Sequence, residues 1–100
     1  MAITLSVSQS GGKLRVYANN SGGNHVVIID HIILSVYWNG SSWHTWHYQD
    51  DFFFGSGRVP TGWAGLIVEM NYSGGSAKAR ATADYWEVDK SVKSPTLNVS

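Results

Sequence analysis

Strict alternation of apolar and polar residues is the feature that most constrains the fold of this 100-residue chain. From Ala77 to Asp84, alanine occupies every second position, with charged residues or threonine between. Successive side chains of a strand point to opposite faces of a sheet, so this pattern predicts a strand with one buried side. Residues 3–8 and 13–19 alternate in the same way. No segment has the three- and four-residue apolar spacing of a helix, so the chain is predicted to be all-β.

Turn-forming residues separate these segments. Asn39-Gly40 favours a hairpin, and the loop NNSGGN at 19–24 predicts a turn with its glycines in the left-handed region. The β-branched run from His25 to Trp38 is too long for one strand of a small domain. We therefore expect a bend or bulge at Asp30-His31, where the strand changes its sheet or its partner.

These segments predict an immunoglobulin-like antiparallel β-sandwich of about seven strands. The sandwich is expected over residues 1–89. Residues 90–100 are polar and contain one proline, so they are predicted to be a C-terminal strand or a polar tail.

The block from Trp38 to Phe54 contains three of the five tryptophans and every phenylalanine. A row of inward alanines leaves space that large side chains must fill, because protein interiors are close-packed. We expect these rings to fill it, with Trp46, Phe53 and Trp63 in structural roles. Alternation sets Trp43, Thr45 and His47 on one face of the strand and His44, Trp46 and Tyr48 on the other. The strand cannot bury all of its rings, and at least one of Trp38, Trp43 and Tyr48 is expected to be partly exposed.

Composition excludes several classes of function. The formal net charge is zero and only 14% of residues are charged. The basic residues are dispersed and form no patch that would hold a phosphate backbone, so nucleic acid is not expected as a partner. The absence of cysteine excludes disulfides and thiolate chemistry.

Motifs of catalysis and metal binding are also missing. The sequence has no nucleophile elbow, no phosphate-binding glycine loop and no zincin pattern, so we predict neither an enzyme nor a bound cofactor. His44 and His47 would point to opposite faces of a strand, and His25 or Asp50 would complete a site only through the fold. No metal site is predicted.

Four asparagines begin an Asn-X-Ser sequence, the acceptor motif for N-linked glycans. They are Asn19, Asn39, Asn71 and Asn98. Together with a surface kept polar by Ser, Thr, Asn and Gly, they favour an extracellular or cell-surface location. The alternative explanation is that asparagine and serine are both common in turns.

Two segments carry a resemblance to a known family. They are LRVYANNSGGNHVVIIDHIIL, from Leu14 to Leu34, and GRVPTGWAGLIVEMNYSGGSAKARATAD, from Gly57 to Asp84. Together they resemble the soluble β-sandwich domains of archaeal type IV pilin-like proteins, which include archaellins and accessory proteins of the archaellum (the archaeal flagellum). Members begin with a processed leader and a long apolar helix. Neither occurs in this sequence, so contact with a membrane is expected only through an anchor absent from this chain.

The resemblance implies a structural or adhesive module of a surface appendage used in motility or anchoring. It would bind a surface-filament subunit, an S-layer protein or copies of itself. We expect the contact on the exposed side of the block from Trp38 to Phe54, together with the run from Val26 to Ile33. The candidate contact residues are Trp38, Trp43, Trp46, Tyr48, Phe52, Val27 and Ile29.

Unpaired strand edges are a second place where a partner binds. Lys13 and Arg15 are expected to protect the second strand from such pairing. The apolar run from Val26 to Val36 has no such protection, so it is expected to be internal or covered.

A carbohydrate-binding module is the alternative from another functional class. Trp43, Trp46 and Tyr48 would stack on sugar rings, and Gln49, Asp50 and Asp51 would bind sugar hydroxyls.

Overall fold

The computed structural model describes residues 3–38, 43–49, 52, 57–72, 76–85 and 90–98. These residues form nine strands and no helix. The strands are β1 (Thr4–Ser10), β2 (Lys13–Asn19), β3 (Val27–Trp38), β4 (Trp43–Tyr48), β5 (Arg58–Val59), β6 (Ala64–Asn71), β7 (Ser76–Tyr85), β8 (Lys90–Lys93) and β9 (Leu97–Asn98).

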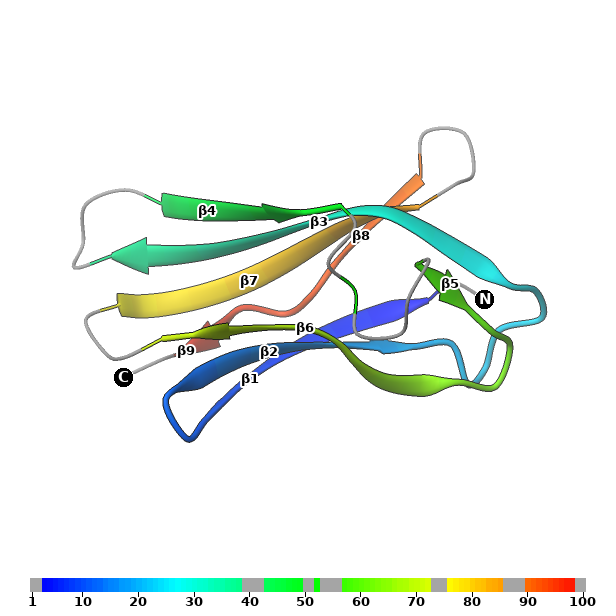
Figure 1. Cartoon of the computed structure of the whole chain (residues 1–100), viewed down its shortest axis with the longest axis horizontal. Helices are drawn as coiled ribbons and strands as arrows, with labels where there is room; N and C mark the ends of the chain where they lie inside the picture. The colour runs from blue at the N-terminus through cyan, green and yellow to red at the C-terminus, as the bar shows by residue number, and fades with distance from the viewer. Residues whose placement is uncertain are drawn as a thin grey trace.

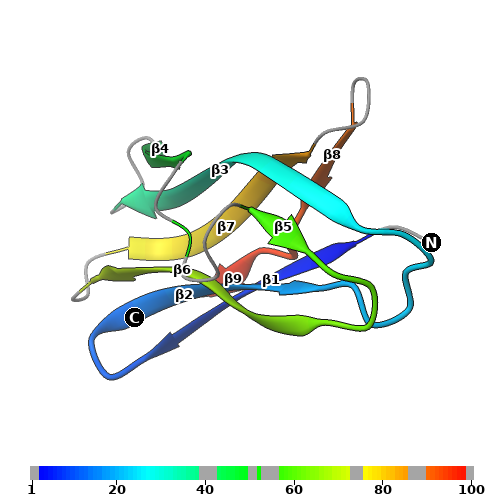
Figure 2. The same cartoon turned by 45° about the vertical axis from the view of Figure 1, so that its right-hand side comes forward.

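The strands form two antiparallel sheets that pack face to face (Figures 1 and 2). The smaller sheet has the order β1-β2-β6. The larger sheet has the order β4-β3-β7-β8, with β5 paired to β3 and β9 paired to β7. The prediction of an all-β, immunoglobulin-like sandwich is confirmed. The strand count exceeds the expected seven because β5 and β9 have two residues each, too few to show an alternating pattern.

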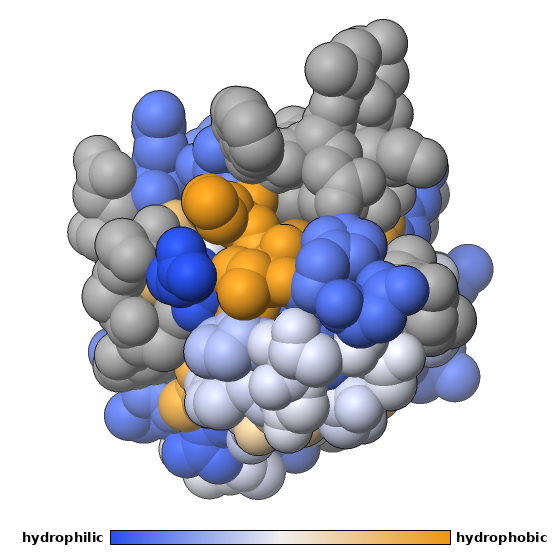
Figure 3. Space-filling model, turned by 90° about the vertical axis from the view of Figure 1, so that its right-hand side faces the viewer, coloured by the Kyte–Doolittle hydropathy of each residue, from blue (hydrophilic) through white to orange (hydrophobic). Residues whose placement is uncertain are grey.

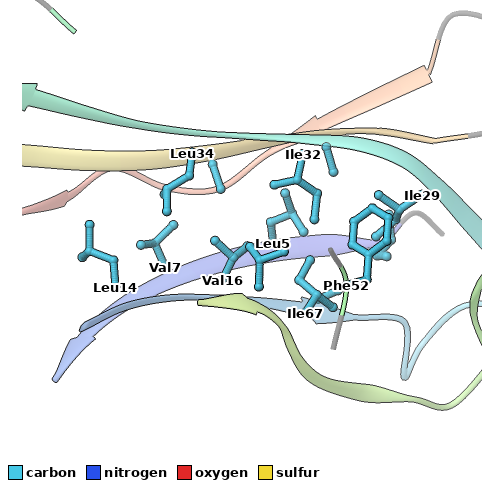
Figure 4. Close-up of a cluster of buried hydrophobic side chains, with 14 of the residues drawn as sticks. Leu5, Val7, Leu14, Val16, Ile29, Ile32, Leu34, Phe52 and Ile67 are labelled. Carbon is cyan, nitrogen blue, oxygen red and sulfur yellow. The ribbon is translucent and has the colours of Figure 1, made fainter. Parts of the chain in front are cut away.

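The first hairpin follows directly from its sequence. Ser10 pairs with Lys13, so Gly11 and Gly12 alone make the turn. Both have positive φ, 56° and 74°, which is the backbone of the two-residue turn that matches strand twist. The predicted inward residues Leu5 and Val16 are buried in the core (Figure 4).

Strand β3 is an interior strand of the larger sheet and contains the expected bulge. Its pairing with β7 shifts register between Ile29 and His31. Before this point β3 pairs with β5, and after it with β4. The extra residue reverses the alternation, so Val27 and Ile29 are inward before the bulge and Ile32 is inward after it. From Ile32 to Val36 the strand is paired on both sides, with β4 and β7, so this part of the run from Val26 to Val36 is internal as expected. The earlier part is not, because Ile28 pairs only with β5 and is exposed.

A second bulge lies in β6 and was not predicted. The pairing of β2 with β6 shifts between Val16 and Tyr17, which leaves Ile67 as the extra residue. Ile67 and Val68 are both buried, whereas Leu66 is only half-buried and pairs with the outward Tyr17. Uninterrupted alternation would set Leu66 on the same face as Val68, and the bulge changes this parity.

The alanine row of β7 lies inward, as expected. Ala79, Ala81 and Ala83 are fully buried, whereas the side chain of Ala77 lies outside the described residues. Strand β1 of the other sheet has Cα atoms within 8 Å of β7, closer than the usual separation of about 10 Å between packed sheets. Aliphatic residues of β1 and β3 fill much of the interior, together with Phe52 from the aromatic block (Figure 4). Trp46 and Trp63 pack against this core, so the expected filling by aromatic rings is only part of the packing.

One buried asparagine joins the loops at the β5 end of the sandwich. The Nδ2 atom of Asn20 donates to the carbonyl oxygens of His25, Val59 and Pro60 at 3.1 to 3.3 Å. Its backbone N–H donates to the carbonyl of Trp63, and its own carbonyl accepts from the N–H of Gly62. Asn20 thus connects the β2–β3 loop to the β5–β6 loop.

The glycines of the β2–β3 loop do not have the left-handed backbone that was expected of them. Gly22 and Gly23 are not among the positive-φ glycines of the described residues. Gly23 is required instead for close approach, because a Cβ there would overlap the side-chain oxygen of Asn20.

Replacing Ala81 by leucine is expected to destabilise the fold by about 1–3 kcal/mol, since the extra methylenes enter an interior that is already full. Thr82→Val, on the outward side of the same strand, is the matched control. Urea denaturation of both variants measures the difference. Equal midpoints for the two would contradict the close approach of the sheets.

Asn20→Asp is expected to cost about 3 kcal/mol, because a carboxylate in place of the amide group faces three carbonyl oxygens and donates to none. Asn24→Asp, in the same loop but exposed, is the control. Thermal unfolding followed by circular dichroism compares them. A loss as small as that of the control would show that Asn20 does not hold the loops together.

Candidate functional site

The outward face of the larger sheet carries aromatic and histidine side chains from neighbouring strands. We call this surface the aromatic face. Its members come from β3, β4, β7 and β8 and are His31, Ile33, Ser35, Tyr37, Trp43, Thr45, His47, Lys78, Arg80, Thr82 and Lys93. The opposite side of the same sheet packs against the smaller sheet. The described strands therefore leave the aromatic face on the outside of the sandwich (Figure 2).

Trp43 is the centre of a cluster at one end of this face. The guanidinium carbon of Arg80 lies 4.2 Å from the centroid of the Trp43 ring, a cation–π contact. Tyr37, directly across from Trp43, meets it edge to face at a centroid distance of 5.3 Å. Ser35 pairs with both Thr45 and Arg80 and is only 5% exposed, so the larger side chains around it shield it. The cluster is thus a preassembled, closely packed surface.

Two histidines meet on the same face. His47 pairs directly with Ile33, and His31 lies two residues further along β3, so the histidines are diagonal neighbours. Nδ1 of His47 lies 2.9 Å from Nε2 of His31, and the ring centroids are 4.9 Å apart. This pair was not predicted. A two-residue turn at Asn39-Gly40 would set Ile32 opposite His47, whereas the observed register sets Ile33 there, so the hairpin signal does not bring the two histidines to one face.

His44 and His47 lie on opposite faces of β4, as alternation predicted. No group of three or more His, Cys, Asp or Glu side chains suited to a metal ion occurs among the described residues. Asp50 and Asp51 lie outside them.

The predicted contact residues do not lie on one surface. Trp43 lies on the aromatic face and is half-buried, as expected. Trp46 and Tyr48 share the inward side with Leu34 and Ile32 and pack at the margin of the core. The side chain of Trp38 lies outside the described residues.

Three predicted contact residues are in the core, and their assignment to a contact surface was wrong. Val27 is 4%, Ile29 2% and Phe52 8% exposed. The bulge in β3 sets the first two inward, and Phe52 lies between the sheets beside Ile29 and Ile67 (Figure 4). Their side chains are not available to a partner of the folded chain.

This division also affects the carbohydrate alternative. Trp43 points outward, whereas Trp46 and Tyr48 point inward, so the three rings do not form one stacking platform. Arg80 occupies one side of the remaining Trp43 ring. Trp46 and Trp63 have the structural role expected of them, and Phe53 lies outside the described residues.

The outward face of the smaller sheet has a different character, because its charges bind one another. Glu69 of β6 accepts from Nε of Arg15 at 2.6 Å and from Nζ of Lys13 at 3.1 Å. The contact with Arg15, and then that with Lys13, hold the pKa of Glu69 below its ordinary value of 4.5. The expectation that Lys13 and Arg15 guard a strand edge was wrong, since β2 is the middle strand of its sheet.

A small apolar patch lies at the end of the sandwich where β5 is found (Figure 3). Ile28, which pairs with Arg58 of β5, is the exposed large apolar residue of the described chain, at 36%. An isolated aliphatic residue of this exposure is common on protein surfaces. This end therefore has less area for recognition than the aromatic face.

Three of the four candidate glycan acceptors are at the surface. Asn19, Asn71 and Asn98 are exposed, and Asn39 lies outside the described residues. In the motif Asn19-Asn20-Ser21, Oδ1 of Asn19 accepts hydrogen bonds from the N–H and the hydroxyl of Ser21, at 2.8 and 2.6 Å.

Comparison with family models, with curated proteins and with solved structures finds no match for this chain. Among its described residues there is no helix with the length and apolar character needed to cross a membrane.

Glu69→Gln is expected to lower the melting temperature at neutral pH, because the neutral amide loses the charged contacts with Arg15 and Lys13. The lowered pKa means that the carboxylate stabilises the fold above about pH 4.5 and that this contribution disappears as the pH falls through the lower folded value. The melting temperatures of the two proteins should therefore converge in acid. A difference that does not change between pH 7 and acid would contradict the charged contact.

Proposed function

We propose that this chain is a non-catalytic, structural or adhesive module of an extracellular surface, and that it acts by protein–protein contact through the aromatic face. The observation that supports this most is the cluster of Tyr37, Trp43 and Arg80. Trp, Tyr and Arg are the residue types most enriched among side chains that dominate binding energy at protein interfaces. Here they are already held together, so a partner would order few side chains on binding.

The charges on the aromatic face favour a particular kind of partner. Three described charged side chains line up across the sheet with Ile33, Ser35 and Tyr37 of β3. They are Lys78, Arg80 and Lys93, and all three are cationic. Like charges directly opposed across an interface are unfavourable, whereas complementary ones increase the rate of association. The partner is therefore proposed to be a protein whose contact surface combines apolar and acidic groups.

The proposed location rests on the chain's surface chemistry. Exposed Asn-X-Ser sequences and a low content of charged residues suit a protein that works outside the cell. The resemblance to archaeal type IV pilin-like domains adds the proposal that the partner is an archaellum or pilus subunit, or an S-layer protein. The role would then be assembly or anchoring.

Trp43→Ala is expected to abolish binding to such a partner while leaving the chain folded, because the ring lies on the surface and the core does not depend on it. The immobilised chain is incubated with archaeal S-layer and filament preparations, and retained protein is quantified by mass spectrometry. Light scattering over a range of concentrations measures self-association in parallel.

Tyr17→Ala is the matched control, since Tyr17 is a half-buried aromatic residue on the outward face of the smaller sheet. Equal retention by both variants would contradict the proposed surface. A shift of tryptophan emission with soluble glycans, lost in Trp43→Ala, would favour a carbohydrate ligand instead.

A further inference from the structure

The His31–His47 pair is close enough for a single hydrogen atom to bridge two ring nitrogens. The separation of 2.9 Å between Nδ1 of His47 and Nε2 of His31 is a hydrogen-bond distance. The two ring planes are 11° from parallel, and the ring centroids are 4.9 Å apart. This centroid distance is close to the sum of the N···N distance and the two ring radii. The rings therefore meet edge to edge, with one nitrogen donating and the other accepting.

The same separation suits two ligands of one metal ion. Imidazole nitrogens bind first-row metals at about 2.0–2.1 Å. Two such ligands at a right angle are about 2.9 Å apart, whereas a tetrahedral angle places them about 3.3 Å apart. The right angle is the geometry of square-planar Cu(II) or Ni(II), and copper binds such ligands more tightly than the neighbouring divalent metals.

The pair lies at the surface of the protein. His47 is exposed and His31 half-buried, and both stand on the aromatic face rather than in the core. Adjacent paired strands hold the two backbones at a fixed separation, so the rings need only turn about their side-chain bonds to exchange the hydrogen bond for a shared ion. Backbone register also places Asp84 of β7 opposite His31.

We propose that His31 and His47 form a two-coordinate, solvent-accessible chelating site for Cu(II). Nδ1 of His47 and Nε2 of His31 are the ligands, and the remaining positions are left to water or to a donor from another molecule. The ring that donates in the free pair moves its proton to its other nitrogen, so two neutral rings bind copper without net release of a proton. The site lies on the aromatic face but outside the cluster of Tyr37, Trp43 and Arg80, and copper binding there does not require the proposed protein contact.

Titration with CuSO4 in a non-coordinating buffer tests this site. The wild-type chain is expected to bind one Cu(II), with an electron paramagnetic resonance spectrum that shows coupling to two nitrogen ligands. His31→Gln and His47→Gln should each weaken binding by about a hundredfold, because a chelate becomes a single ligand. Circular dichroism checks that both variants remain folded.

His44→Gln is the matched control, since His44 lies on the same strand but on the opposite face. It should bind copper as the wild type does. The double variant His31→Gln/His47→Gln gives the background from all other groups of the chain. Wild-type binding no tighter than this background, or an equal loss in His44→Gln, would overturn the proposal. Asp84→Asn tests whether the carboxylate of Asp84 is a third ligand. Coupling to two nitrogens in the spectrum of this variant would support the two-histidine site as proposed.

Discussion

The close approach of β1 to β7, whose described inward side chains are alanines, is the constraint on which the rest of the molecule depends. Because Ala79, Ala81 and Ala83 are small, aliphatic residues and Phe52 are enough to fill the remaining volume. The tryptophans are then not needed at the centre of the core. Trp46 stays at its margin and Trp43 is on the outside, where its ring is available for contact. Tight packing inside thus explains the aromatic surface outside.

The two outward faces differ in how far their groups are already engaged with one another. On the smaller sheet, Glu69 holds both Lys13 and Arg15, and this charged network is complete within the fold. On the larger sheet, Arg80 lies over the ring of Trp43. No acidic side chain among the described residues lines up across the sheet with Ile33, Ser35 or Tyr37 of β3. An acidic protein surface would neutralise the cations of this face, and this asymmetry is why the proposal concerns the aromatic face.

Alternation was sufficient to predict most of the sandwich, because parity decides the burial of every residue within an uninterrupted strand. The predictions failed where parity changes. The bulge at Ile67 turned Leu66 outward, and the change of parity in β3 made Val27 and Ile29 core residues. The His31–His47 pair was missed for a related reason, since it depends on register between strands rather than on spacing along one. Two-residue strands such as β5 have no period to detect and form only where a longer strand receives them.

The pairing of β2 with β6 has a kinetic consequence. Lys13 pairs with Asn71, so the smaller sheet forms only after a long loop has closed, whereas β3 and β4 are neighbours in the chain. Folds dominated by such distant pairings reach the native state in about milliseconds to seconds, and local hairpins form far sooner. During that interval Leu34 and Val36 on the early hairpin lack their cover. A newly made chain would then expose a sticky intermediate, and a rapid supply of copies would favour aggregation over correct closure.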